Sequence, residues 1–168
     1  MEGQDTRPTT DRIKETLFNM LHNEMADCFF IDLFSGRGGI GIEALSRGAR
    51  KVVFVEKAPK AVACIKENLV KTKMENDAVV MASDAVSAIY RLDGGDPADF
   101  IFMDPPYNQQ LEQQVLEALK DSTLVDEYTT IIIEADLQTD FSYVEDLGYE
   151  ITRQKKYKTN QHVFLERV

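Results

Sequence analysis

The stretch Asp32-Leu33-Phe34-Ser35-Gly36-Arg37-Gly38-Gly39-Ile40-Gly41 decides the fold, because it joins a short apolar run to a helical pattern. Its glycines at positions 36, 38 and 41 have the spacing G-x-G-x-x-G. Such glycines allow a tight turn from strand to helix and a close approach of backbone to a ligand. Glu56 follows 20 residues after the first of them, at the end of a second apolar run. A carboxylate there can accept hydrogen bonds from a ribose diol, so the pattern predicts a β-α-β unit that binds a ribose-containing ligand.

Short apolar runs alternate with helical patterns along most of the chain. The runs are rich in Val, Ile and Phe and barely alternate with polar residues, which is typical of strands buried on both faces. We expect strands over 29–33, 51–56, 78–82, 99–104 and 130–134. Apolar stripes at helical spacing precede the first run and follow the second and the fourth. This order predicts an α/β fold with a mostly parallel sheet and helices on both faces.

The end of the chain breaks the alternation. Residues 148–153 and 161–168 have the pattern of two strands, and the polar stretch 154–160 between them is too short for a helix. We therefore expect a terminal antiparallel hairpin, which brings the sheet to seven strands. In such sheets ligands bind beyond the carboxyl ends of the strands, near the point where the strand order reverses.

Composition describes one soluble domain. The 168 residues suit a single domain, which we divide into an N-terminal segment and helix (1–25) and an α/β core (26–168). Two well-separated cysteines and two histidines predict neither a metal site nor a disulfide framework. No apolar run approaches the roughly 18 residues of a membrane span. We expect a cytoplasmic protein without a metal and without membrane contact.

The charge does not by itself indicate nucleic-acid binding. The formal net charge is −10, from 19 basic and 29 acidic residues, whereas phosphate binding usually needs a basic surface. The basic residues do gather near the two ends of the chain. They are Arg7, Arg12 and Lys14 at one end and Arg153, Lys155, Lys156 and Lys158 at the other.

The tetrapeptide Asp104-Pro105-Pro106-Tyr107 follows the fourth predicted strand. Two prolines fix the turn and leave carbonyl oxygens exposed, so a carboxylate and a carbonyl can hold both hydrogens of an exocyclic amine. This grip aims the nitrogen lone pair at an electrophile by positioning and electrostatics. Tyr107 offers a flat face on which a flipped-out base can stack. The pattern predicts a site for a nucleobase amine.

The glycine loop alone leaves the ligand open between a nicotinamide dinucleotide and S-adenosylmethionine. Asp32 favours the second, because a carboxylate suits the ammonium group of its methionine part better than it suits a pyrophosphate. Asp84 follows the third predicted strand, where it could accept a hydrogen bond from an adenine amine or cap the next helix. Both interpretations of Asp84 stay open.

Together the loop and the tetrapeptide resemble the Rossmann-like class I S-adenosylmethionine-dependent methyltransferases. The stretches Asp5-Thr6-Arg7-Pro8-Thr9-Thr10-Asp11-Arg12, Gly41-Ile42-Glu43-Ala44-Leu45-Ser46-Arg47-Gly48-Ala49 and Val53-Phe54-Val55-Glu56-Lys57 narrow the resemblance to the RsmD family. Its members methylate the N2 amine of a guanine in 16S rRNA, and the likeness covers nearly the whole chain. The implied partner is 16S rRNA within the small ribosomal subunit or an assembly intermediate of it.

The resemblance also implies roles for individual residues. The cofactor would contact Asp32, Phe34, Ser35, Gly36, Gly38, Glu56, Lys57, Asp84 and Ala85. The catalytic turn would be Asp104, Pro105, Pro106 and Tyr107, and the substrate would meet Arg7, Thr9 and Tyr107. The sequence departs from the family pattern at two places. It does not include the basic β segment that usually precedes the T-R-P-T stretch, which would mean either a truncated chain or a member that has lost part of its RNA-binding surface. Arg37 stands where a small residue is more common.

Three other functions are consistent with parts of the pattern. An adenine-N6 methyltransferase acting on DNA or RNA could use the same tetrapeptide. A nicotinamide-dependent oxidoreductase would explain the glycine loop but gives Asp104 no task. An inactive nucleotide-binding or ribosome-assembly module would keep the loop and the basic ends without catalysis.

Overall fold

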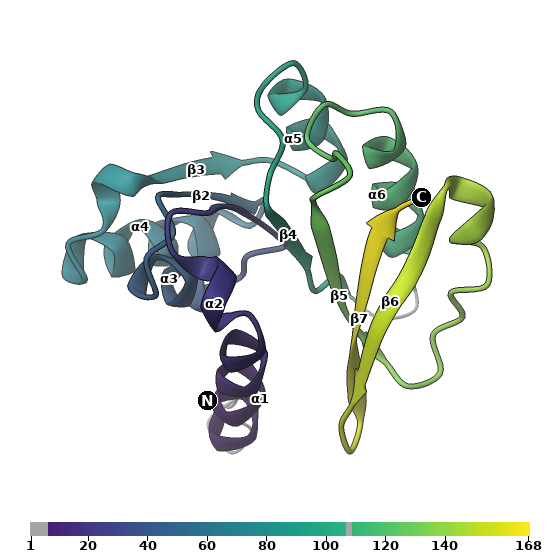
Figure 1. Cartoon of the computed structure of the whole chain (residues 1–168). Coiled ribbons are helices and arrows are strands. Elements are labelled where there is room, and N and C mark those ends of the chain that lie inside the picture. The colour runs from purple at the N-terminus through teal and green to yellow at the C-terminus, as the bar shows by residue number, and fades with distance from the viewer. Residues whose placement is uncertain (1–6, 107–108) are drawn as a thin grey trace.

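A seven-stranded sheet forms the centre of the computed structural model, which describes residues 7–106 and 109–168 (Figure 1). The strand order is β3-β2-β1-β4-β5-β7-β6. The first five strands pair in parallel, and β7 is antiparallel to both β5 and β6. The strands are β1 (Phe29–Leu33), β2 (Lys51–Glu56), β3 (Ala78–Ala82), β4 (Phe100–Met103), β5 (Thr130–Asp136), β6 (Tyr149–Lys156) and β7 (Asn160–Arg167). The predicted α/β sheet with a terminal hairpin is confirmed.

Some strand ends differ from the prediction. β5 extends two residues past the predicted end at 134, and β6 extends three past 153, because β7 pairs with both strands along its length. Only residues 157–159 then remain for the turn of the hairpin. β4 is shorter than predicted, since Asp99 lies outside the strand and its carboxylate accepts a hydrogen bond from the Phe29 N–H at 2.8 Å.

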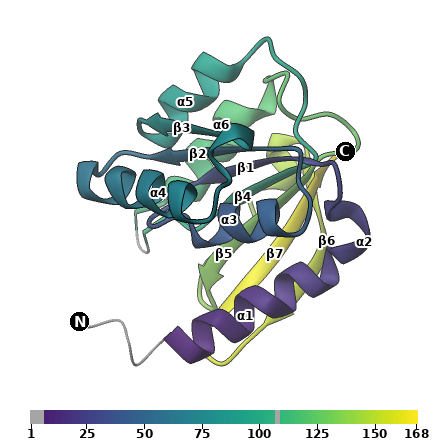
Figure 2. The same cartoon turned by 90° about the vertical axis from the view of Figure 1, so that its left-hand side faces the viewer.

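Helices cover both faces of the sheet (Figure 2). Side chains alternate between the faces of a strand, so each strand contributes to two apolar layers. One layer joins α1, α3 and α4 to a face containing Phe30, Phe54, Phe102 and Phe164, and the other joins α5 and α6 to the opposite face. The helices are α1 (Arg7–Met20), α2 (His22–Met25), α3 (Gly39–Ser46), α4 (Pro59–Lys71), α5 (Ala85–Leu92) and α6 (Leu111–Lys120), with 3-10 turns at Glu75–Asp77 and Glu145–Leu147. None of the helices in the described ranges is long and apolar enough to cross a bilayer.

The strand order reverses between β1 and β4. The chain moves outward from β1 to β2 and β3, then returns to pair β4 with the other side of β1. The segments that leave β1 and β4 therefore diverge at the carboxyl edge of the sheet, where parallel α/β folds bind their ligands. These segments are the glycine loop and the turn that begins at Asp104.

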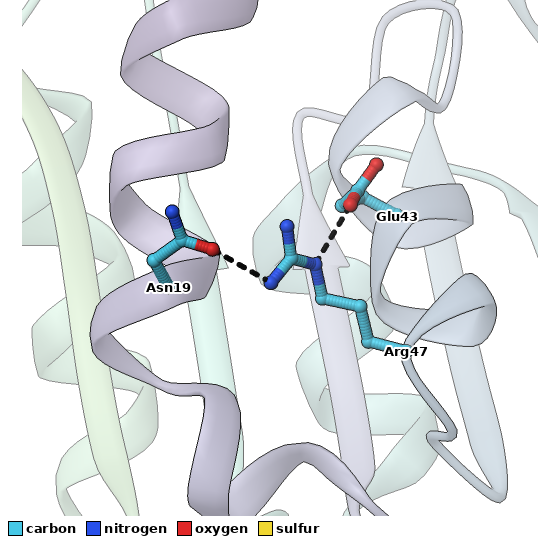
Figure 3. A network of polar contacts seen from close by, with 3 residues as sticks. All are labelled: Asn19, Glu43 and Arg47. Atoms are coloured by element: carbon cyan, nitrogen blue, oxygen red, sulfur yellow. Dashed lines mark hydrogen bonds and ion pairs between the residues drawn. The ribbon is translucent and has the colours of Figure 1, made fainter.

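Helix α1 is attached to the core through α3 (Figure 3). The Arg47 guanidinium donates from Nη1 to Asn19 Oδ1 on α1 at 3.1 Å and from Nε to Glu43 Oε2 on α3 at 2.7 Å. It also lies 5.6 Å from the centroid of the Phe18 ring, which is fully buried. In Figure 1, α1 and the turn of the β6–β7 hairpin extend to the same side of the molecule. Helix α1 thus forms a wall beside the carboxyl edge of the sheet.

Candidate active site

Two hollows meet at the carboxyl edge of the sheet. The first has a volume of about 550 Å³, and the second, bounded partly by α1, has about 480 Å³. Phe34, Asp104 and Glu134 line both. The other residues that line the first hollow are Gly36, Val55, Glu56, Lys57, Ser83, Asp84, Ala85, Val86, Pro105, Pro106, Gln109, Leu111, Gln114 and Val115. The other residues that line the second hollow are Asp11, Ile13, Lys14, Asp32, Ser35, Arg37, Gly39, Ile40, Phe102, Asn160 and His162. Two compartments that share a few polar groups suit a reaction between two bound molecules.

The glycine loop brings the start of α3 close to the sheet. Gly38 has φ 88°, and Gly41 lies so close to the Phe54 ring that a Cβ on it would overlap the ring. Phe34 also has positive φ, at 59°, which is uncommon for a residue with a side chain. Such backbone strain is concentrated at ligand-binding sites. Here the residue with the strained backbone is Phe34, which lines both hollows.

Glu56 is held in place at the edge of the first hollow. Its Oε1 accepts a hydrogen bond from the Gly36 N–H at 2.8 Å, and its Oε2 accepts one from the Ala58 N–H at 3.1 Å. Each carboxylate oxygen can accept a second hydrogen bond. The arrangement leaves both oxygens able to receive the two hydroxyls of a ribose, so it fits the role expected for Glu56.

Asp84 caps α5. Its Oδ2 accepts a hydrogen bond from the Ser87 N–H at 3.1 Å, and hydrogen bonds with Ser87 lower the pKa of Asp84. The prediction that Asp84 caps the following helix is therefore confirmed. Asp84 and Ala85 also line the first hollow beside apolar Val55 and Val86, so contact of Asp84 with an adenine amine stays a prediction.

Three of the residues expected to contact the cofactor lie outside the first hollow. Asp32 and Ser35 line the second, and Gly38 lines neither. The Asp32 side chain is only 1% exposed, and its Oδ2 accepts a hydrogen bond from the Gly41 N–H at 3.1 Å. Burial, with smaller contributions from Asp104 and Glu56, raises the pKa of Asp32 to about 8. Its expected contact with a cationic ligand stays a prediction.

Asp104 lies where the two hollows meet. Asp104 is exposed, and it borders both hollows. Loss of solvent around its carboxyl group, together with the negative charge of Glu134, raises the pKa of Asp104 to about 7. Pro105 and Pro106 line the first hollow. Tyr107 lies outside the described residues, and so do the side chains of Arg7 and Thr9 at the start of α1.

Glu134, Asn160 and His162 are site residues that the sequence analysis missed. His162 Nε2 lies 2.8 Å from Glu134 Oε1, and Asn160 Nδ2 donates to Glu134 Oε2 at 3.2 Å. Glu134 is in the last part of a parallel strand, so the rule that directed attention to Asp104 also applies to it. Asn160 and His162 come from the hairpin, whose register decides their position and is not visible in the sequence.

Comparisons with known proteins agree with the sequence resemblance. A family model described as "Conserved hypothetical protein 95" matches residues 1–166. The Bacillus subtilis protein named "Putative rRNA methyltransferase YlbH" is 36% identical over 157 residues, which is 92% of this chain and 84% of the relative. Ribosomal RNA small subunit methyltransferase D of Escherichia coli K12 is 34% identical over 79% of this chain, which spans 65% of that relative's length. The solved structure described as "Putative methyltransferase yhhF from Escherichia coli" has a TM-score of 0.82 at 29% identity, covering 95% of this chain and 86% of that one.

Proposed function

Because the chain belongs to the family described as conserved hypothetical protein 95, the RsmD family, we propose that it methylates a ribosomal RNA. The reaction proposed is methyl transfer from S-adenosylmethionine to the exocyclic N2 amine of a guanine in 16S rRNA. The observation that carries the proposal is the position of Asp104, which is shared by two hollows at the strand-order reversal. One hollow would hold the methyl donor and the other the base.

The first hollow fits S-adenosylmethionine by its chemistry. Glu56 has free acceptor positions for a ribose diol, and Val55, Val86 and Val115 offer an apolar surface to an adenine ring. Phe34, Gly36, Glu56, Lys57, Asp84 and Ala85 are the residues expected from the sequence that line this hollow. When bound, this cofactor supplies an electrophilic methyl group carried on a sulfonium.

The second hollow suits a flipped nucleotide. Lys14 and Arg37 are part of its lining and provide cations for a phosphate, while Asp104 and Glu134 provide acceptors for the base. Extrusion of a base from its stack is how enzymes reach base atoms. Arg37 is the residue at which the glycine loop departs from the family, and its proposed role is to bind a phosphate at the second hollow.

Asp104 would act on the amine in two ways. Its carboxylate accepts a hydrogen bond from one N–H of the amine, which orients the nitrogen lone pair. No strong base is needed before attack, because the proton is lost after the nitrogen becomes cationic. A pKa of about 7 for Asp104 lets this carboxylate receive that proton near neutral pH.

The proposed partner is an assembled small subunit, or an assembly intermediate, rather than free RNA. A net charge of −10 disfavours tight binding to naked RNA, whereas a subunit also offers protein surfaces. The cytoplasm is the corresponding proposed location.

The test is transfer of labelled methyl from S-adenosylmethionine to small subunits purified from cells that lack the enzyme. We expect label in the 16S rRNA with the wild-type protein and less by about a hundredfold or more with Asp104→Ala, which removes the acceptor for the amine. Asp146→Ala, at an exposed aspartate that lines neither hollow, is the matched control and should keep wild-type activity. Equal transfer by Asp104→Ala and wild type would contradict the proposal, as would cofactor binding without any transfer by the wild type.

A further inference from the structure

The face of the sheet inside the second hollow carries carboxylates on neighbouring strands. Met103 of β4 pairs with Ile133 of β5, so Asp104 and Glu134 occupy equivalent positions one residue further along. Phe102 and Ile132, two residues before them, pack in the same apolar layer, so Asp104 and Glu134 belong to that face as well. Neighbouring strands lie about 4.8 Å apart, so carboxylates at equivalent positions of the two strands can reach one small ligand from neighbouring sides.

Glu134 is oriented by two side chains from the neighbouring strand β7. His162 is its register partner on β7, and the His162 imidazole and the Asn160 amide each contact one of its carboxylate oxygens, at 2.8 and 3.2 Å. His162 is further packed against the rings of Phe102 and Tyr157, with centroids 6.1 and 5.5 Å away. Each oxygen of Glu134 retains room for one more hydrogen bond, toward the hollows that it lines.

The same network contains polar atoms without partners. His162 Nδ1 and Asn160 Oδ1 are buried and have no hydrogen-bond partner within the described part of the chain. The two residues are 1% and 8% exposed, and both line the second hollow. Most buried polar atoms in folded proteins have a partner, so unpaired ones at a hollow indicate that a polar ligand belongs there.

We infer that Glu134, oriented by His162 and Asn160, selects guanine over adenine by accepting the hydrogen of ring nitrogen N1. This inference rests on the proposed function, because it assumes that the amine is held at Asp104. Guanine carries a hydrogen on N1 beside its N2 amine, so its edge presents donors to both Asp104 and Glu134. Adenine has a lone pair on N1 beside its N6 amine, and this lone pair faces a carboxylate unfavourably. The negative charge of Glu134 contributes to the raised pKa of Asp104. This effect is consistent with the carboxyl groups of Asp104 and Glu134 lying close enough to contact one base edge.

Glu134→Gln tests the selection with little change of shape. The glutamine keeps an oxygen for His162, and rotation of the Asn160 amide would present its oxygen to the new NH₂ group. The glutamine NH₂ can also donate a hydrogen bond to a base nitrogen that lacks a hydrogen. Glu150→Gln is the matched control, because Glu150 is exposed on β6 and lines neither hollow.

The substrates are two small subunits reconstituted with 16S rRNA that carries guanine or 2-aminopurine at the methylated position. 2-Aminopurine keeps the same amine but has a lone pair on N1. It also lacks O6, but a contact to O6 would affect both enzymes alike. We expect the wild type to prefer guanine by about a hundredfold or more in kcat/KM, since sites built for a hydrogen bond reject analogues that lack it. Glu134→Gln should reduce this preference at least tenfold, and Glu150→Gln should leave it unchanged.

The outcomes separate this inference from the proposed function. If Glu134→Gln lowers activity on both substrates equally, Glu134 has only a structural or general electrostatic role and the inference is wrong. An unchanged preference in Glu134→Gln also overturns it. If the wild type methylates neither subunit although it binds the cofactor, the proposed function itself fails.

Discussion

Replacing Asp32 with Asn should stabilise the protein increasingly as the pH rises. Asp32 is 1% exposed, and burial is the largest cause of its raised pKa. The folded protein therefore keeps this carboxyl protonated at neutral pH, whereas the unfolded chain ionises it. An asparagine is neutral in both states, and its side-chain oxygen can accept the hydrogen bond that Gly41 N–H donates to Asp32. The substitution removes the pH-dependent cost and keeps the shape.

The size of the effect follows from the two pKa values of Asp32. The pKa is 3.8 for the ordinary group and about 8 in the folded protein. Between these values the unfolded state binds fewer protons than the native state, so the free energy of unfolding falls as pH rises. The limiting slope is about 1.4 kcal/mol per pH unit. From pH 5 to pH 7 the stability gap between Asp32→Asn and wild type should therefore widen by roughly 2 to 3 kcal/mol.

Urea unfolding of the cofactor-free protein at pH 5, 6 and 7 measures this gap. Comparing the gap across pH cancels any constant difference in hydrogen bonding or packing between the two side chains. Asp96→Asn, in the exposed loop before β4, controls for the loss of one surface carboxylate. A gap that stays constant or narrows with pH would show that Asp32 is ionised in the folded protein and would refute the reasoning.

Four further results are expected. The kcat/KM for methyl transfer should rise through about pH 7 as Asp104 ionises. Glu134→Gln removes a like charge and should move the midpoint of this pH profile to lower pH, and an unmoved midpoint would contradict the influence of Glu134 on Asp104. Glu56→Gln should weaken S-adenosylmethionine binding about tenfold by calorimetry, because one acceptor for the ribose becomes a donor; an unchanged Kd argues against the ribose contact. Gly41→Ala should cost about 1–3 kcal/mol in urea unfolding, since its Cβ overlaps the Phe54 ring, and a neutral result would contradict the close packing. Arg47→Ala should increase amide exchange in α1 by releasing its contacts to the core, and unchanged exchange would mean that apolar packing alone holds the helix.

The sequence predicted the order of the elements well, because buried parallel strands and helical stripes have distinct patterns. It also identified the glycine loop and Asp104 as neighbours, since the carboxyl ends of β1 and β4 meet wherever the strand order reverses. The capping role of Asp84 was one of two interpretations and is observed in the structure.

Other features depend on tertiary geometry that one sequence does not display. The loop folds back so that Gly41 N–H reaches the Asp32 carboxylate, and Asp32 lines the second hollow. Its expected contact with the methionine part of the cofactor stays a prediction. Helix α1 is held in position by the contact of Arg47 with Asn19 and by the buried side chains of Leu17 and Phe18. The β-α-β pattern does not predict these contacts. His162 reaches Glu134 only because of the antiparallel register of β7 against β5.

The identity of the methylated nucleoside tests the central claim most directly. Small subunits from cells lacking the enzyme are incubated with the protein and labelled S-adenosylmethionine, and the 16S rRNA is digested to nucleosides and separated. The account predicts that the label is found in N2-methylguanosine. Label in N6-methyladenosine would contradict it, because an adenine in the second hollow would place a lone pair against Glu134.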